Sequence, residues 1–300
     1  MSTQSYGRGI ALAAAGMLVI SPDGLLIRLL DATGPWQLVF WRTAFMALAL
    51  AVGLAIAYGG RLLPIARALG GGGLLAGIII GLSNVTFVGA ITNTTVANTL
   101  VILATLPLFA ALFARAILGE RVAPRTWAVI AVAFAGMVLI FANSLGGGSL
   151  TGDALALLTA ALFSLGVVIL RRAGNRDMTA ALWVGAMVSA LIALPLSLAG
   201  PSGLSLSGLV VPAGDMAILA LLGLLILPLA FTLYIAGARY APAAEIGLIS
   251  LLQTVLGPLW AWLGVGERPA AAALAGGAVV IAAIAINSTL PLLRRRRRPA

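Results

Sequence analysis

Apolar stretches of membrane-spanning length follow one another along almost the whole of this chain of 300 residues. Crossing the hydrocarbon core of a bilayer takes about 20 consecutive apolar residues in an α-helix. Glycine and proline punctuate the chain between these stretches, where helices end or restart. The sequence therefore predicts an all-α, polytopic membrane protein with ten transmembrane helices, at residues 8–30, 35–58, 72–93, 95–117, 124–144, 151–172, 178–199, 214–239, 242–265 and 269–290.

The composition excludes several classes of protein. Hydrophobic residues make up 62% of the chain and charged residues 9%, whereas a soluble domain carries about 25% charged residues. Cysteine and histidine are absent, which removes disulfides, thiol nucleophiles, histidine bases and metal sites built from these residues. We therefore expect no catalytic residue, no metal and no cofactor. A membrane-embedded enzyme is a weak alternative, since an intramembrane aspartyl protease needs a second embedded aspartate beside Asp23.

The basic residues predict the orientation of the chain in the membrane. All 18 are arginines, and cytoplasmic loops of membrane proteins are enriched in such residues. With the N-terminus in the cytoplasm, only Arg28 and Arg268 fall outside, whereas the residues inside are Arg8, Arg61, Arg67, Arg115, Arg121, Arg125, Arg171, Arg172, Arg176, Arg239 and Arg294 to Arg298. We expect a multi-pass inner-membrane protein with both termini in the cytoplasm, whose basic tail meets anionic lipid and no nucleic acid.

The two halves of the sequence resemble each other. A shift of 147 residues places Gly119-Glu120-Arg121 on Gly266-Glu267-Arg268, and a shift of 143 pairs Ser21 with Ser164 and Arg28 with Arg171. Each half holds five predicted spans, and an odd number makes the second copy enter the membrane upside down. We expect one five-helix repeat at residues 1–147, an inverted second repeat at 148–293 and a basic cytoplasmic tail at 294–300, with a ligand site near the midplane between the repeats.

These features resemble a known family. Spans four and nine each carry a central proline, Pro107 and Pro258, and each ends in Gly-Glu-Arg. The chain is similar to the EamA group of the drug/metabolite transporter (DMT) superfamily, most specifically over Thr94–Arg121 and Pro242–Arg268. Its length and the segment Trp36–Arg42 are similar to the bacterial aromatic amino acid exporters. The resemblance implies export of metabolites, often amino acids, without ATP.

Charged residues inside a span are expensive and should be paired or hydrated. Asp23 and Arg42 each lie about seven residues from an outer span end, which places both about 10 Å deep. We predict an ion pair between them, either as a brace or in contact with substrate. Glu245 is the other acidic residue embedded in a span and a candidate for coupling to protons. Glu120 and Glu267 should cap helix ends beside Arg121 and Arg268.

Prolines within spans free a backbone carbonyl and bend the helix. We expect bends at Pro22, Pro107 and Pro258, and the last two are either pivots for rocking the two halves or static kinks.

Uncharged polar residues concentrate in the spans that the repeat relates. Candidate substrate-binding residues are Asn84, Asn98, Thr99, Ser164, Tyr234, Gln253 and Trp260. Each could instead form a hydrogen bond between helices. Spans five, seven and ten are almost purely apolar, so they should face lipid. Gly77 and Gly81 should pack closely within a monomer, although a dimer is possible.

The sequence as a whole predicts a secondary transporter that exports small zwitterionic metabolites, amino acids including aromatic ones, by alternating access. Its partners would be this small-molecule substrate and membrane lipid. Proton-coupled efflux of other small metabolites or drugs is the alternative within transport.

Overall fold

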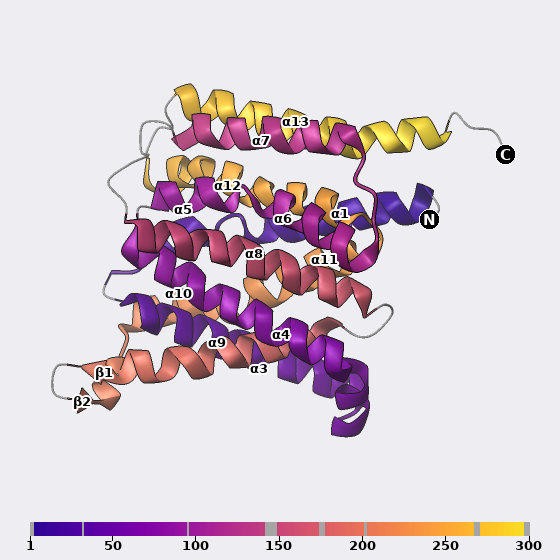
Figure 1. Ribbon diagram of the computed structural model, residues 1–300. Coiled ribbons are helices and arrows are strands. Elements are labelled where there is room, and N and C mark those ends of the chain that lie inside the picture. Colours follow the sequence, from indigo (N-terminus) through magenta and orange to yellow (C-terminus); the bar gives the residue numbers. More distant parts are fainter. Residues whose placement is uncertain are drawn as a thin grey trace.

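The computed structural model describes residues 3–31, 33–94, 96–141, 149–173, 178–200, 203–266 and 271–296. These residues form a helical protein (Figure 1). Eight helices or helix pairs are long and apolar enough to cross a membrane, and two shorter apolar helices cover Pro124–Leu139 and Leu274–Asn287. The prediction of an all-α, polytopic membrane protein is confirmed.

The elements follow the ten predicted spans in order. Three spans are interrupted. Span one is α1 (Thr3–Ile20) and α2 (Asp23–Arg28), span four is α5 (Val96–Leu103), α6 (Leu106–Phe113) and the π-helix η1 (Ala114–Leu118), and span eight is α10 (Ala213–Leu221), the π-helix η4 (Leu222–Ile226) and α11 (Leu227–Ala238). Span three lies in α4 (Leu62–Asn93), which breaks before the span, at Gly70. The other spans are α3 (Pro35–Tyr58), α7 (Pro124–Phe141), α8 (Leu150–Arg172), α9 (Met178–Leu198), α12 (Ala243–Val265) and α13 (Ala271–Arg296).

The chain termini lie at the same end of the molecule, and the loop between spans seven and eight lies at the opposite end (Figure 1). That loop holds a small hairpin of β1 (Ala199–Gly200) and β2 (Gly203–Leu204), followed by the short 3-10 helix η3 (Leu206–Leu209). Termini on one side are what an even number of membrane crossings requires.

Helices of the two repeats alternate around a central ring. Neighbours in contact run from α1 to α12, α6, α8, α4, α9, α3, the η4 segment, α11 and back to α1. The contacts obey the predicted repeat: exchanging spans one to five with six to ten maps the α1–α11 contact onto the α8–α4 contact and the α1–α12 contact onto the α8–α6 contact. The repeats are therefore intercalated, and the expected rocking of two separate halves does not describe these contacts.

Two of the three predicted proline bends are present as helix interruptions, and the third is not. Residues 21 and 22 form a turn between α1 and α2, so the bend expected at Pro22 is present. In span four the turn falls at residues 104 and 105, just before Pro107, which cannot donate the hydrogen bond that would continue the helix. By contrast, α12 passes position 258 as a single helix, and the side chain of Pro258 lies outside the described residues.

The helix that holds span three begins before the predicted start at residue 72. Residues 62–69 are helical, and the helix breaks at Gly70, where φ is 54° and ψ is 177°. Only glycine adopts this backbone conformation without strain, so Gly70 separates a short helical arm from the membrane-spanning part of α4.

Span seven faces lipid less than predicted. Half of the residues in the α9 window are buried, the largest share among the eight candidate spans. The reason is glycine: a Cβ at Gly77 would lie 2.6 Å from the carbonyl oxygen of Ala181, and one at Gly81 would lie 2.7 Å from that of Gly185. The Gly77–Gly81 pair thus lets α4 approach α9 within one monomer, as predicted.

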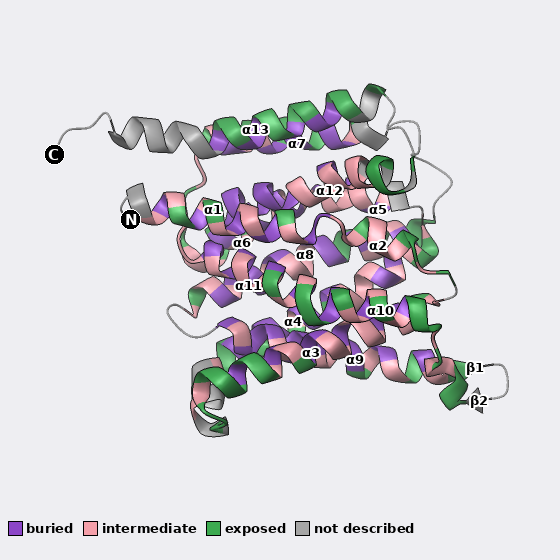
Figure 2. Ribbon diagram, turned by 180° about the vertical axis from the view of Figure 1, so that it is seen from behind, coloured by how far each residue is buried: buried purple, intermediate pink, exposed green. Residues whose placement is uncertain are grey.

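The outer faces carry large apolar side chains that a bilayer would cover. Exposed residues run along α3 and α13 at two edges of the molecule (Figure 2). Ile56 on α3 is 77% exposed and Leu191 on α9 is 60% exposed. Spans five and ten, α7 and α13, pack on each other at one edge, as expected for lipid-facing helices (Figure 1).

Candidate functional site

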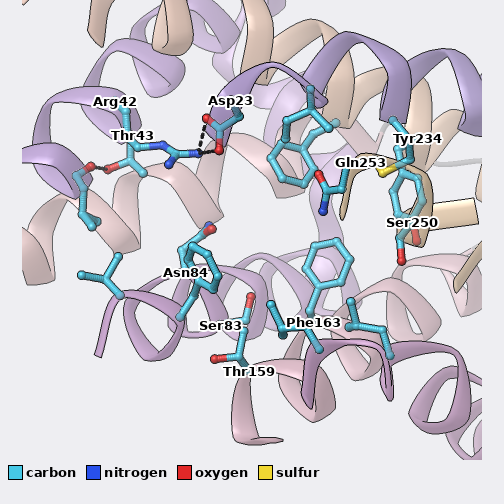
Figure 3. A pocket seen from close by; sticks show the side chains of 18 residues that line it. Asp23, Arg42, Thr43, Ser83, Asn84, Thr159, Phe163, Tyr234, Ser250 and Gln253 are labelled. Atoms are coloured by element: carbon cyan, nitrogen blue, oxygen red, sulfur yellow. Dashed lines mark hydrogen bonds and ion pairs between the residues drawn. The ribbon is translucent and has the colours of Figure 1, made fainter. Parts of the chain in front are cut away.

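A central cavity of about 140 Å³ lies inside the helix ring (Figure 3). Its walls come from spans one, two, three, four, six, eight and nine, so both repeats contribute. The lining residues are Met17, Ile20, Asp23, Val39, Arg42, Thr43, Ser83, Asn84, Phe87, Val88, Leu103, Leu106, Thr159, Phe163, Phe231, Tyr234, Ser250 and Gln253. Spans five, seven and ten contribute none of them.

An ion pair forms one end of this cavity. Nη2 of Arg42 lies 3.2 Å from Oδ1 and 3.4 Å from Oδ2 of Asp23 (Figure 3). The two side chains are 14% and 22% exposed, respectively, which leaves each in reach of the cavity. The pair predicted from matching depth is confirmed. Asp23 and Arg42 are the charged residues of the lining, so the formal charge of the lining is zero.

The break in span one places Asp23. The hydroxyl of Ser21 donates to the carbonyl oxygen of Leu18 at 2.7 Å, and Nε1 of Trp260 donates to that hydroxyl at 2.8 Å. Trp260 was expected among the substrate-binding residues, but it lies outside the cavity lining and instead holds the turn that precedes Asp23.

The π-helix η4 places Arg42. A Cβ at Gly223 would lie 2.5 Å from the carbonyl oxygen of Arg42 and 2.5 Å from Cβ of Phe45. Only a residue without a side chain fits there, so the backbone of η4 packs directly on α3. π-Helical turns inside α-helices occur frequently at functional sites.

The structure divides the predicted substrate-binding residues into two groups. Asn84, Tyr234 and Gln253 line the cavity. Asn98, Thr99 and Ser164 lie outside its lining. Nδ2 of Asn98 lies 3.4 Å from Oδ1 of Asp153, Thr99 is fully buried, and the Ser164 hydroxyl donates to the Leu106 carbonyl at 3.0 Å. For Asn98 and Ser164, the alternative of a hydrogen bond between helices describes what the structure shows.

Aromatic rings form another wall, and Tyr234 is the one among them that the sequence predicted. Phe163 lies 6.2 Å from both Tyr234 and Phe231, measured between ring centroids. Phe87 also lines the cavity. The repeat contained a signal for this wall, because a shift of 147 places Phe87 on Tyr234. Single phenylalanines in an apolar span are otherwise indistinguishable from core residues.

A charged seam joins the repeats at the end that carries the termini. Glu245 on α12 is 5% exposed, accepts a hydrogen bond from the hydroxyl of Tyr6 on α1, and lies 3.9 Å from Nη2 of Arg125 on α7. Residues 243 to 251 of α12 are all buried. Glu245 is therefore embedded, as predicted, and ties span nine to spans one and five.

Glu120 completes this seam with a partner other than the expected Arg121. Its Oε1 lies 2.7 Å from Nη2 of Arg171, and its Oε2 accepts from the backbone N–H of Ala243 at 3.4 Å. Nε of Arg171 donates to the carbonyl oxygen of Ala238 at 2.6 Å. Glu120 does cap a helix, but the helix belongs to the other repeat. Glu267 and Arg268 lie outside the described residues.

The family of the chain follows from a comparison with family models. The model described as the EamA-like transporter family matches residues 7–142 and again residues 150–289. The chain belongs to the EamA-like transporter family. It is a multi-pass secondary transporter of the DMT superfamily and not an enzyme, with two family segments as the predicted repeat requires.

Two further similarities accompany this assignment. A riboflavin transporter of Rhizobium johnstonii is 31% identical over 203 residues, which cover 65% of this chain and 62% of that protein. A crystal structure of a protein whose function is not stated matches with a TM-score of 0.78 at 20% identity, over 94% of this chain and 98% of the other. The second similarity supports the fold alone.

This EamA-like transporter holds one buried and one half-buried acid at the opposite end, and neither was predicted as an embedded residue. Asp215 is 2% exposed and accepts hydrogen bonds from the Thr33 hydroxyl at 2.7 Å and the Asp31 backbone N–H at 3.2 Å. Asp153 accepts from the Thr94 hydroxyl at 2.7 Å. Both follow a window start by one or two residues, where boundary uncertainty hides burial.

Proposed function

We propose that this protein exports small zwitterionic metabolites, amino acids including aromatic ones, by alternating access across a bacterial-type inner membrane. The observation that carries the proposal is the cavity lining. It combines one acidic and one basic side chain with four aromatic rings and several uncharged hydrogen-bonding groups. A ligand with both charges and an apolar ring complements all three features.

The size of the cavity supports a small ligand. Its volume of about 140 Å³ is close to that of the apolar protein cavities, about 150 Å³, that accommodate benzene. In this conformation the cavity matches a single aromatic ring, so enclosing a whole ring-bearing amino acid requires it to widen during the cycle.

The organisation of the chain supports alternating access. We assign the first repeat to residues 1–147, the second to 148–293 and the basic tail to 294–300. Because the repeats intercalate, the moving parts contain helices of both, with the interruption before Pro107 as one pivot. The arginine distribution supports placing the termini, and so the charged seam, on the cytoplasmic side.

Riboflavin is a second candidate substrate, on the strength of the 31% identical relative named as a riboflavin transporter. Its fused rings would use the same aromatic wall. It carries no ammonium or carboxylate group, however, and leaves the Asp23–Arg42 pair without a role in recognition.

Counterflow in liposomes tests the proposal. Purified protein is reconstituted with unlabelled L-phenylalanine inside, and uptake of labelled L-phenylalanine is compared with uptake of labelled riboflavin in a matched preparation. Empty liposomes and the Ser207→Ala variant, changed in the exposed outer loop, serve as controls. Repeating the assay with a pH gradient tests proton coupling, for which Glu245 and Asp23 are the candidate residues.

Saturable counterflow of L-phenylalanine supports the proposal. Counterflow of riboflavin alone assigns the second substrate, and counterflow of neither compound contradicts both.

A further inference from the structure

We propose that Asp23 and Arg42 recognise an amino acid by exchanging partners with it. The substrate carboxylate takes Arg42, the substrate ammonium takes Asp23, and the internal ion pair opens to admit both. This inference rests on the proposed function and names the two residues that would select zwitterions over singly charged relatives.

The geometry of the pair leaves room for a second carboxylate. Both oxygens of Asp23 contact the same nitrogen, Nη2 of Arg42, so the pair is not the two-pronged arrangement in which two nitrogens meet two oxygens. A guanidinium carries five N–H donors in a rigid fork. The fork of Arg42 can therefore take a substrate carboxylate with little movement.

Asp23 offers a complementary acceptor. Its Oδ1 atom is buried and, among the described residues, receives no hydrogen bond, although Nη2 of Arg42 lies 3.2 Å away as an ion-pair contact. A buried carboxylate oxygen without a donor is unfavourable. A substrate ammonium, with three N–H donors, would satisfy it.

The electrostatics of a membrane interior make this exchange selective. Removing one partner from a buried ion pair leaves an uncompensated charge, which is strongly destabilising. A carboxylate-only ligand that takes Arg42 strands Asp23, and an ammonium-only ligand that takes Asp23 strands Arg42. A zwitterion replaces one ion pair by two, so no charge is stranded.

The position of the pair suits the rest of the ligand. Figure 3 shows Asp23 and Arg42 at one end of the cavity, with Asn84 beside them and Tyr234 and Phe163 further along the cavity. The α-substituents of an amino acid share one carbon, so both charges reach the pair while the side chain extends toward the rings.

Binding of three matched probes tests the exchange. The probes are L-phenylalanine, 3-phenylpropionate, which lacks the ammonium, and 2-phenylethylamine, which lacks the carboxylate. Titration calorimetry on detergent-solubilised protein avoids their passive passage through lipid. We expect the wild-type protein to bind L-phenylalanine at least about tenfold more tightly than either analogue, since each analogue lacks one charged hydrogen bond and strands one charge.

Single variants should change the order of the probes. Asp23→Asn should make 3-phenylpropionate the preferred probe, and Arg42→Gln should make 2-phenylethylamine the preferred probe. The double variant Asp23→Asn/Arg42→Gln strands no charge, so it keeps the fold, and it should lose the preference for L-phenylalanine over both analogues. Asp215→Asn is the matched control: it alters a buried acid outside the cavity lining and should keep the wild-type order.

If the pair only braces the helices, the variants lose thermal stability and keep the wild-type order of probes, which overturns the inference and leaves the proposed function standing. If a single variant does not fold, the order of the probes in the double variant decides between a role in recognition and a role as a brace. A wild-type protein that binds none of the probes overturns both proposals.

Discussion

Two groups of charged residues lie in the interior of this protein, and they connect different helices. Asp23 and Arg42 belong to one repeat and line the cavity, with exposures of 22% and 14%. The charged seam at the end that carries the termini, formed by Tyr6, Glu245 and the Glu120–Arg171 pair, joins the two repeats away from the cavity lining. On the proposed mechanism, the cavity pair meets a substrate without any seam contact breaking, whereas opening the end that carries the termini separates the seam.

The largest expected effect lies at the cavity pair. Arg42→Leu strands Asp23 in the membrane interior, which costs about 3–5 kcal/mol, so folded yield should fall and transport should drop to background. Fluorescence-detected size-exclusion chromatography measures the yield and counterflow measures transport.

The double variant Asp23→Leu/Arg42→Leu is the control for this prediction. It strands no charge, so yield should recover while transport stays absent. Normal yield together with normal transport in Arg42→Leu would show that the pair has no role.

Glu245→Gln should act on opening and leave recognition intact. The variant keeps the shape of the side chain and turns the charge-assisted hydrogen bond from Tyr6 into a neutral one, a difference of about 1–1.5 kcal/mol, so the end that carries the termini should open about fivefold to tenfold more often. The chain contains no cysteine, which makes a single reporter specific. Ile246→Cys, at a position with 0% exposure, should react faster with a maleimide from the cytoplasmic side.

Asp153→Asn alters the opposite end, so it should leave this labelling unaccelerated. A labelling rate unchanged by Glu245→Gln would mean that the seam does not hold the end that carries the termini closed.

Trp260→Phe tests how the cavity pair is positioned. It keeps an aromatic ring but removes the donor to Ser21, so the turn before Asp23 should loosen. We expect substrate affinity to weaken about threefold to tenfold, since a neutral hydrogen bond contributes about 0.5–1.5 kcal/mol. Trp262→Phe, at a side chain that is 45% exposed, is the matched control in the same transport assay. Equal substrate affinity in the two variants would show that Trp260 does not position Asp23.

The smallest effect is expected for a neutral contact between the repeats. The hydroxyl of Ser189 donates to the carbonyl oxygen of Gly81 at 3.0 Å. Such bonds between membrane helices contribute about 0.6 kcal/mol, so Ser189→Ala should lower thermal stability slightly and leave transport unchanged. A large loss of transport would show that contacts between α4 and α9 are needed for the transport cycle.

The sequence correctly predicted the features that can be read from the individual spans, namely their positions and the matching depth of two charged residues. Window length and hydropathy located the spans, and equal depth predicted the Asp23–Arg42 pair, because the cost of a membrane charge is a local property. The number of spans per half predicted the inversion of the repeats. Spans five, seven and ten, which were predicted to face lipid, contribute no residue to the described cavity lining.

Predictions that needed to know which helices meet were less successful. Trp260, Asn98 and Ser164 are polar and embedded, but each faces another helix and none lines the cavity. Glu120 was assigned to Arg121, next to it in the chain, and pairs with Arg171 on another helix. Span seven is apolar both where it meets α4 and where it meets lipid, so composition could not separate the two environments. Whether the cavity residues bind substrate is a question for the variants above.

Access to the two ends of the cavity is the most direct test of the account. Ile246→Cys reports on the charged seam and Val88→Cys, in the cavity wall, reports on the opposite side. Each is labelled with an impermeant maleimide in sealed membrane vesicles, with and without L-phenylalanine. We predict that the substrate shifts the two labelling rates in opposite directions. Rates that do not respond, or that rise and fall together, would contradict alternating access through this cavity.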